Sequence, residues 1–249
     1  MKIYTILTIL FLSHSVVCQA FNLDTNSWND FEGKIDSSDI QLSLYLFENG
    51  EIKGNYCYKK YETKIQLFGH LSGNEIELTE MIGNTENGFF KGKIFTDSLD
   101  RFEGKWKNKT KTKELKFELT LSSICRGSYV FRYSSAFYGT TSEIENFMKQ
   151  IKTSILNNDK NWLSNHICYP ITVTLNKTRT VKITNKKELL ENYDKIIHND
   201  FKKKISEYYT VNLFNNWRGA MIGNGEIWIN NKPNSTENNY DYCITTINN

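Results

Sequence analysis

Proline and long apolar runs are both scarce in this sequence of 249 residues. Proline occurs only twice, while aromatic residues make up 14% and charged residues 24% of the chain. That composition is too apolar for a disordered protein and fits one or two folded cores. Beyond residue 12 no apolar run approaches the roughly 20 residues that a membrane-spanning helix needs. We therefore expect a soluble, globular mature protein without a transmembrane segment.

An excess of charge of one sign is also missing. The 31 basic and 28 acidic residues nearly cancel, leaving a net charge of +3. A nucleic-acid surface would concentrate basic charge on one face. The basic clusters 109–113 and 202–204 are more simply a solvated turn and a solvated helix face, so we expect no nucleic-acid partner.

Catalytic and metal-binding motifs are absent as well. The chain has no Gly-x-Ser-x-Gly elbow, no His-Glu-x-x-His and no phosphate-cradling loop. Gly223-Asn224-Gly225 lies between two apolar runs and has the chemistry of a hairpin turn. No histidine stands at zinc-ligand spacing from a cysteine. The sequence thus predicts no catalytic residue, no metal and no cofactor.

The N-terminus has the order of a cleavable signal peptide. Lys2 precedes an apolar run from Ile3 to Leu12, and small or compact residues follow up to Ala20. We assign residues 1–20 to this peptide and expect a secreted or periplasmic protein. Because the residues before Cys18 are bulky, we do not expect a lipid anchor there.

Four cysteines remain after the signal peptide, and four allow three pairings. Two lie in each half of the chain, so our hypothesis is that Cys57 bonds Cys125 and Cys168 bonds Cys243. The alternative is that the thiols are buried and free.

The first half carries a repeated apolar-x-Gly-x-apolar pattern. A glycine inside an alternating strand indicates a bend or a close backbone approach in a strongly curved sheet. Period-two runs such as Leu42/Leu44/Leu46 surround these segments, and short turns separate them. Short connections require antiparallel neighbours. We therefore predict a domain over residues 21–135, an all-β antiparallel meander of about seven or eight strands that forms a small barrel or a flattened sandwich. The glycine-centred segments are 31–35, 52–56, 67–71, 90–94 and 102–106.

Residues 52–119 of this meander resemble a module of bacterial periplasmic proteins. The resemblance rests on steps such as Gly54-Asn55-Tyr56-Cys57-Tyr58 and Phe102-Glu103-Gly104-Lys105-Trp106. The resemblance implies a periplasmic location and does not imply an activity.

The second half, residues 136–249, changes to helical spacing. Ser142 and Glu145 form a candidate capping box before an amphipathic helix, and a short helix is expected from Asp159 to His166. A hairpin over 171–183, a helix capped by Thr184 or Asn185, and a further helical piece follow. Strands are expected at 211–214, 218–222, 226–229 and 240–247. Together these elements predict an α+β domain whose curved antiparallel sheet wraps helices.

Three blocks of this half look like the secreted bacterial branch of the NTF2-like, cone-shaped α+β fold. They are Tyr169-Pro170-Ile171-x-Val173, the stretch from Lys187 to Ile196, and the stretch from Arg218 to Ile229. The resemblance implies a fold that hosts enzymes, binding pockets and dimerisation modules alike. A homodimer through the C-terminal sheet is therefore left open.

In such a cone, Tyr193 and Trp228 would line a pocket with Arg218 at its mouth; the alternative for Trp228 is core packing. The family's enzymes use a pocket carboxylate or histidine as general base, so Asp194, Glu226, His166 and His198 are the candidate general bases. Capping and surface roles suit them better. Our leading prediction is an exported, non-catalytic binding protein for a protein, a glycan or a small ligand, and the alternative is a small-molecule isomerase or hydrolase in the cone.

Overall fold

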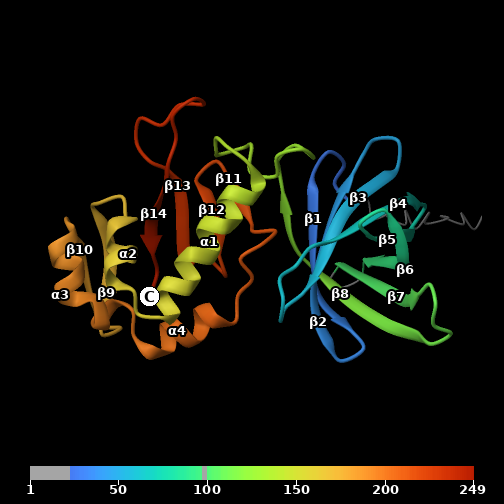
Figure 1. Ribbon diagram of the computed structural model, residues 1–249, viewed down its shortest axis with the longest axis horizontal. Helices are drawn as coiled ribbons and strands as arrows, with labels where there is room; N and C mark the ends of the chain where they lie inside the picture. The colour runs from blue at the N-terminus through green and yellow to red at the C-terminus, as the bar shows by residue number, and fades with distance from the viewer. Residues whose placement is uncertain (1–22, 97–99) are drawn as a thin grey trace, which may run out of the picture.

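The computed structural model describes residues 23–96 and 100–249. They form two lobes that lie side by side, a β-barrel and a C-terminal α+β lobe, joined by a connecting segment (126–140) (Figure 1). The predicted signal peptide lies outside the described residues. None of the described helices is both long and apolar enough to cross a membrane.

The barrel is an antiparallel meander, as its short turns predict. Each strand pairs with the next, and β1 pairs with β8 to close the sheet. The closed barrel is thus the right alternative and the flattened sandwich is wrong. The strands are β1 (Trp28–Ile35), β2 (Ser38–Leu46), β3 (Glu51–Tyr58), β4 (Ile65–Ser72), β5 (Glu75–Ile82), β6 (Thr85–Thr96), β7 (Asp100–Asn108) and β8 (Glu114–Cys125).

Side chains fill the interior of the barrel. The alternating positions of every strand, among them Phe31, Leu42 and Phe102, are buried in one apolar cluster. Gly92 faces Gly104 across β6 and β7, and a Cβ atom on Gly104 would lie 2.5 Å from the Gly92 Cα. This close approach accounts for the two glycines at these places in the repeated pattern.

One carboxylate lies inside the barrel. Glu80 on β5 is buried and accepts hydrogen bonds from the Tyr56 hydroxyl (2.7 Å), from the Trp106 indole (2.9 Å) and from the Asn87 amide. Each of its oxygens therefore has a donor, as a buried carboxylate requires. Burial, followed by the negative charge of Glu80, raises the pKa of Tyr56, so this phenol stays a donor.

The C-terminal lobe has the predicted α+β character. Its helices are α1 (Thr141–Leu156), α2 (Lys160–Asn165), α3 (Lys186–Ile196) and α4 (Asn199–Ser206). A hairpin of β9 (Ile171–Leu175) and β10 (Arg179–Ile183) stands apart from a sheet of β11 (Asn215–Asn216), β12 (Gly219–Ile222), β13 (Ile227–Asn231) and β14 (Tyr242–Ile247). One apolar core joins the helices to both sheets.

Two local predictions in this lobe are wrong. The capping box of α1 is formed by Thr140 and Glu143, two residues before the predicted pair, because Thr140 has the extended backbone of an N-cap. Residues 211–214 form no strand. Their backbone bonds side chains instead: the Asn212 N–H donates to Glu145 (2.8 Å) and the Leu213 N–H donates to the Tyr133 hydroxyl (3.1 Å).

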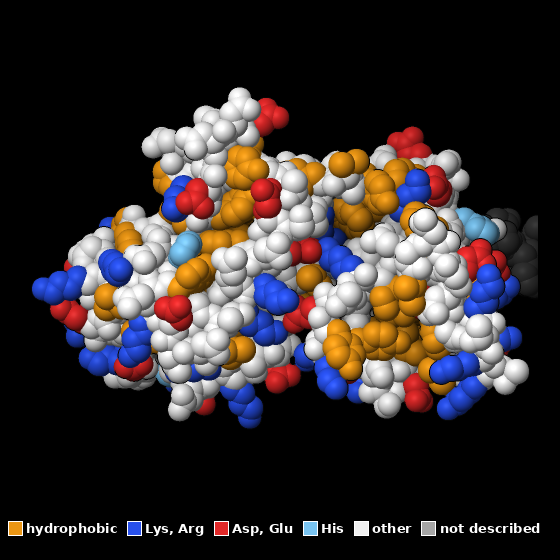
Figure 2. All heavy atoms as spheres, in the orientation of Figure 1, with side chains coloured by type: hydrophobic (Ala, Val, Ile, Leu, Met, Phe, Trp, Pro, Cys, Tyr) orange, Lys and Arg blue, Asp and Glu red, His pale blue; other side chains and the backbone are white. Residues whose placement is uncertain are grey.

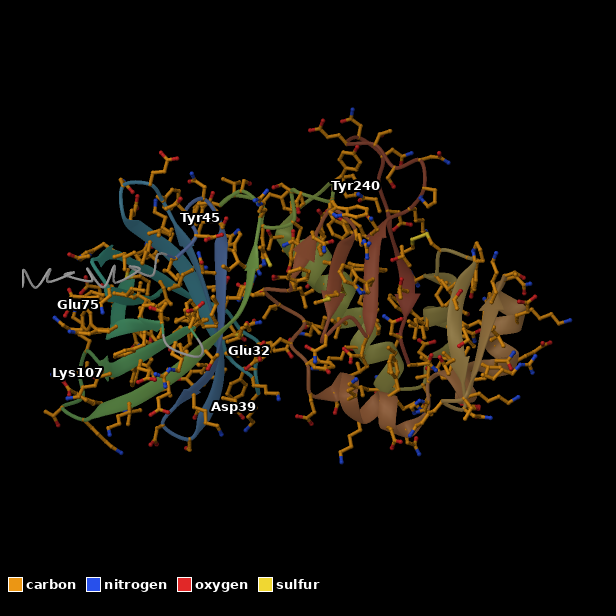
Figure 3. The ribbon with its side chains drawn as sticks, turned by 180° about the vertical axis from the view of Figure 1, so that it is seen from behind. Glu32, Asp39, Tyr45, Glu75, Lys107 and Tyr240 are labelled. Atoms are coloured by element: carbon orange, nitrogen blue, oxygen red, sulfur yellow. A yellow bond between two sulfur atoms is a disulfide. The ribbon has the colours of Figure 1, made fainter. Side chains whose placement is uncertain are left out.

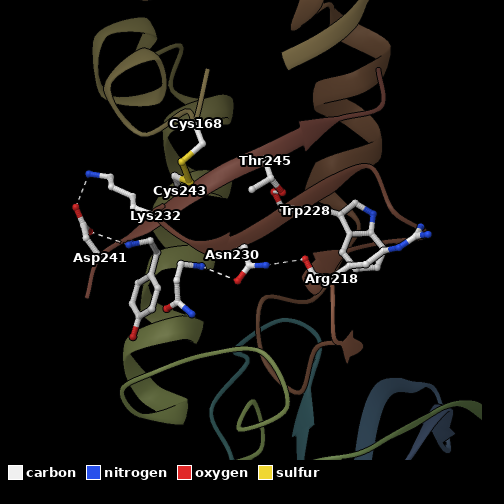
Figure 4. Close-up of a disulfide and its surroundings, with 10 residues drawn as sticks. Cys168, Arg218, Trp228, Asn230, Lys232, Asp241, Cys243 and Thr245 are labelled. Carbon is white, nitrogen blue, oxygen red and sulfur yellow. Dashed lines mark hydrogen bonds and ion pairs between the residues drawn. A yellow bond between two sulfur atoms is a disulfide. The ribbon is translucent and has the colours of Figure 1, made fainter. Parts of the chain in front are cut away.

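The Cys168–Cys243 disulfide is confirmed, and it ties the segment after α2 to β14 (Figure 4). The predicted Cys57–Cys125 bond is wrong, since both thiols are free and buried. Strand register explains this outcome. Cys125 on β8 pairs with Trp28 of β1, whereas Cys57 lies on β3, three strands from β8, in the row of Glu32. Four residues along β1 separate those rows by about 13 Å, beyond the roughly 7 Å that a disulfide spans between Cα atoms.

Candidate functional site

The three residues predicted to form a cone pocket have different environments. Tyr193 on α3 is buried in the C-terminal core. Trp228 is half-buried on β13, and Arg218 is exposed just before β12 (Figure 4). The Arg218 guanidinium lies 4.9 Å from the centre of the Trp217 ring. Among the described residues no hydrogen bond or ring contact joins the three. A pocket beneath them stays a prediction.

Three of the candidate general bases, His198, His166 and Asp194, have structural partners. His198 caps α4 through Nδ1, and His166 stacks on Trp162 with 3.9 Å between ring centres. Asp194 is exposed and forms an ion pair with Lys160 (2.7 Å). Such contacts are those of capping and surface groups.

The outer face of β1, β2 and β3 is a second candidate region for a functional site. Antiparallel register places nine of its outward side chains in three rows. All nine except Glu32 and Lys53 are buried, although they lie outside the barrel. The C-terminal lobe and the connecting segment cover them. The rows are Glu32–Gln41–Cys57, Asp30–Ser43–Asn55 and Trp28–Tyr45–Lys53.

Arg132 of the connecting segment anchors the middle row. Its side chain is 2% exposed and forms an ion pair with Asp30. It also donates to the Ser43 hydroxyl (2.8 Å) and to the backbone oxygens of Asn212 (3.1 Å) and Leu213 (3.2 Å). Desolvation alone would lower the pKa of Arg132, but the Asp30 charge outweighs it, so the pKa is raised and the guanidinium stays charged. One side chain thus joins the barrel to the segment that follows α4.

Further polar contacts surround this anchor. Glu145 of α1 is paired with Lys64 of the barrel at 2.6 Å, and Glu62 accepts from the Thr210 backbone at 2.9 Å. Figure 2 shows basic and acidic side chains next to each other along the junction of the two lobes. The interface is therefore a polar, paired one rather than an apolar seam.

The first row opens into a cleft between the lobes. It has a volume of about 480 Å³, with Glu32, Gln41, Ser122 and Ser123 on the barrel side. The opposite wall is formed by residues 207–209, 212–214, 221, 223 and 224, which include Tyr208, Tyr209 and Phe214. Figure 3 shows Glu32 on the side of the barrel that faces the C-terminal lobe.

Two buried oxygens in this cleft have no hydrogen-bond donor among the described residues. They are Oε1 of Gln41, a side chain 5% exposed, and Oδ1 of Asn212, a side chain 2% exposed. The Asn212 amide nitrogen donates to Asn55 (2.7 Å), which leaves the Asn212 carbonyl oxygen as the unpartnered atom of that amide.

Negative charge prevails around the cleft. Desolvation raises the pKa of Glu32 although its side chain is exposed; the nearby Asp30 raises this pKa further and Lys59 lowers it. Burial also raises the pKa of Tyr209, and the charge of Glu32 contributes to the shift.

No protein-family model, curated protein or solved structure matches this chain. The site thus has to be interpreted from its own geometry. Sequence reasoning missed Gln41 and Asn212 because they lie 171 residues apart, on different lobes. One signal did exist: the outward positions of β1–β3 include the compact polar residues Asp30, Ser43 and Asn55, whereas those of β6–β8 hold mainly lysine and glutamate.

Proposed function

We propose that this chain is an exported, non-catalytic binding protein that holds a small polar ligand in the cleft between its lobes. The observation that carries the proposal is the cleft itself, whose walls hold polar and aromatic side chains of both lobes. The cleft volume lies within the range of small-molecule sites.

The side chains of the cleft support binding rather than chemistry. Its serine hydroxyls donate to Asp30: Ser122 to the backbone oxygen (3.1 Å) and Ser123 to the carboxylate (2.8 Å). Among the described residues, no histidine lines the cleft to serve as their base. A serine nucleophile needs such a base within hydrogen-bond reach, and the isomerase or hydrolase alternative has no observation of its own in favour.

The other parts of the proposal concern location and fold. The Cys168–Cys243 disulfide supports an oxidising compartment, in agreement with the predicted signal peptide. A helical layer against an antiparallel sheet is consistent with an NTF2-like C-terminal lobe, which we retain as a proposal. In this view that lobe supplies one wall of the cleft.

The test is a thermal-shift screen of the full chain against small amines, amino acids, sugars and organic acids. A ligand present at 100 times its dissociation constant should stabilise the protein by about 2.7 kcal/mol. The Gln41→Met variant changes the polar lining of the cleft at nearly constant volume and should reduce the shift. Gln150→Met, the same change at an exposed position of α1, should not. The proposal is rejected if no compound stabilises the protein, or if Gln41→Met and Gln150→Met respond alike.

A further inference from the structure

Three turns of the structure carry the motif Asn-x-Ser/Thr, in which x is any residue except proline. The motifs are Asn108-Lys109-Thr110, Asn176-Lys177-Thr178 and Asn234-Ser235-Thr236. In a secreted protein this motif accepts an N-linked glycan. We propose that all three asparagines are N-glycosylated, an inference that rests on the proposed export of the chain and not on the proposed ligand.

Each motif lies where one strand turns into the next. Asn108 is the last residue of β7, Asn176 lies in the β9–β10 turn, and Asn234 lies in the loop that joins β13 to β14. That loop projects beyond the sheet at the top of Figure 1. Asn176 and Asn234 are exposed and have φ angles of 50° and 68°, a backbone geometry that asparagine tolerates in turns. The surface of the protein therefore presents both of them to solvent, and Asn108 is half-buried beside an exposed turn.

The amide nitrogens that would accept the glycan have few contacts. No hydrogen bond joins Nδ2 of Asn176 or Asn234 to another described residue. Nδ2 of Asn108 has one long contact, 3.5 Å from the Asn87 side-chain oxygen. The Asn108 oxygen accepts from the Thr110 hydroxyl at 2.8 Å, so the two functional side chains of this motif touch. A glycan on Nδ2 would thus displace little of the fold.

The buried asparagines lack the motif. Asn29, Asn55, Asn212 and Asn215 are at most 7% exposed. The second residue after each of them is phenylalanine, cysteine, phenylalanine and tryptophan, respectively. A glycan at these positions would have to open the core or the junction between the lobes. The motif is therefore confined to places where the folded protein has room for a glycan.

The three turns also lie away from the proposed ligand site. Among the described residues that line the cleft, none belongs to a motif. Figure 3 shows Lys107, the neighbour of Asn108, at the end of the barrel that points away from the C-terminal lobe. The Cys168–Cys243 disulfide is consistent with a secretory route. Of the two locations expected from the sequence, the inference selects secretion over the periplasm, and it leaves the cleft open.

The reaction is a glycosyl transfer whose co-substrate is an oligosaccharide linked to a polyprenyl pyrophosphate. A bond forms between C1 of the first sugar and the asparagine Nδ2, and the bond between C1 and the pyrophosphate oxygen breaks. The amide loses one proton, and the polyprenyl pyrophosphate leaves. This chain is the substrate of a cellular transferase, so it needs no catalytic group of its own.

The first test is mass spectrometry of the mature protein from its natural source, before and after digestion with peptide-N-glycosidase F in H₂¹⁸O. The enzyme converts each glycosylated asparagine into an ¹⁸O-labelled aspartate. We expect a loss of mass on digestion and label at Asn108, Asn176 and Asn234. An unlabelled peptide overturns the inference for that asparagine, and three unlabelled peptides overturn it altogether, while the ligand screen still stands.

Variants of the full chain secreted from a eukaryotic host test the motif itself. Thr178→Ala should abolish the glycan at Asn176, whereas Thr178→Ser should keep it. Asn158→Gln is the matched control, because Asn158 is exposed in a turn with a φ of 58° but has no motif, and it should leave all glycans in place. A glycan that survives Thr178→Ala overturns the inference for Asn176. If the host does not export the chain, the inference and the proposed export both fail, and the thermal-shift screen decides separately on binding in the cleft.

Discussion

Replacement of Arg132 by methionine should destabilise the protein more than any surface change. The guanidinium is buried, pairs with Asp30 and donates to Ser43 and to two backbone oxygens of the other lobe. Its removal leaves the Asp30 carboxylate buried without a counter-ion. Breaking a buried pair in this way costs about 3–5 kcal/mol, equivalent to a fall in Tm of about 10 °C for a chain of this size.

The assay is urea and thermal unfolding followed by tryptophan fluorescence. Arg126→Met is the matched control, because Arg126 lies on the same connecting segment and is exposed. The double variant Asp30→Asn with Arg132→Met removes the stranded charge and should recover at least about 1 kcal/mol relative to Arg132→Met alone. If Arg132→Met stays within about 1 kcal/mol of the wild type, as Arg126→Met should, the anchoring role is refuted.

Three other outcomes are expected. Replacing Cys168 and Cys243 by alanine opens a link across 75 residues and should cost about 4 kcal/mol in urea unfolding; an unchanged midpoint would contradict this. Burial raises the pKa of Cys57 to about 12 and also raises that of Cys125, so a thiol reagent at pH 8 should modify both only after unfolding. Burial acts to raise the pKa of Glu226, but hydrogen bonds from a lysine and a backbone amide outweigh it and hold the pKa below 4.5. Its ionised form therefore stabilises the fold above about pH 4.5, and this contribution is lost as the pH falls through the lowered pKa. Glu226→Gln should be less stable than the wild type at pH 7, and the difference should shrink toward about pH 3; a constant difference would argue against the assignment.

The barrel could be predicted from the sequence because its determinants are local. Alternation such as Leu42/Leu44/Leu46 and short turns fix the strands and their antiparallel order. The helices of the C-terminal lobe were predicted for the same reason. The ends of helices are harder to predict than their existence. The N-cap of α1 is Thr140 and not the predicted Ser142, because several neighbouring residues there are able to cap.

The interface and its cleft could not be predicted, because their contacts are distant in sequence. Arg132 and Asp30 are 102 residues apart, and Asn55 and Asn212 are 157 apart. From the sequence, Ser43 and Gln41 alternate with leucines and resemble the solvent side of an ordinary strand. Only the second lobe turns that side into an interior. The failed Cys57–Cys125 pairing has the same origin, since counting cysteines per half carries no information about register.

The three rows on the outer face of the barrel differ in what covers them, and this difference creates the site. Trp28 and Tyr45 of the third row pack on Tyr129, and the middle row is locked by Arg132. Both rows hold the lobes at a fixed separation. The first row is then left beside a space that no described side chain fills. Because the walls are fixed before a ligand arrives, binding requires little ordering of the protein, and the preformed cleft favours affinity for a small ligand.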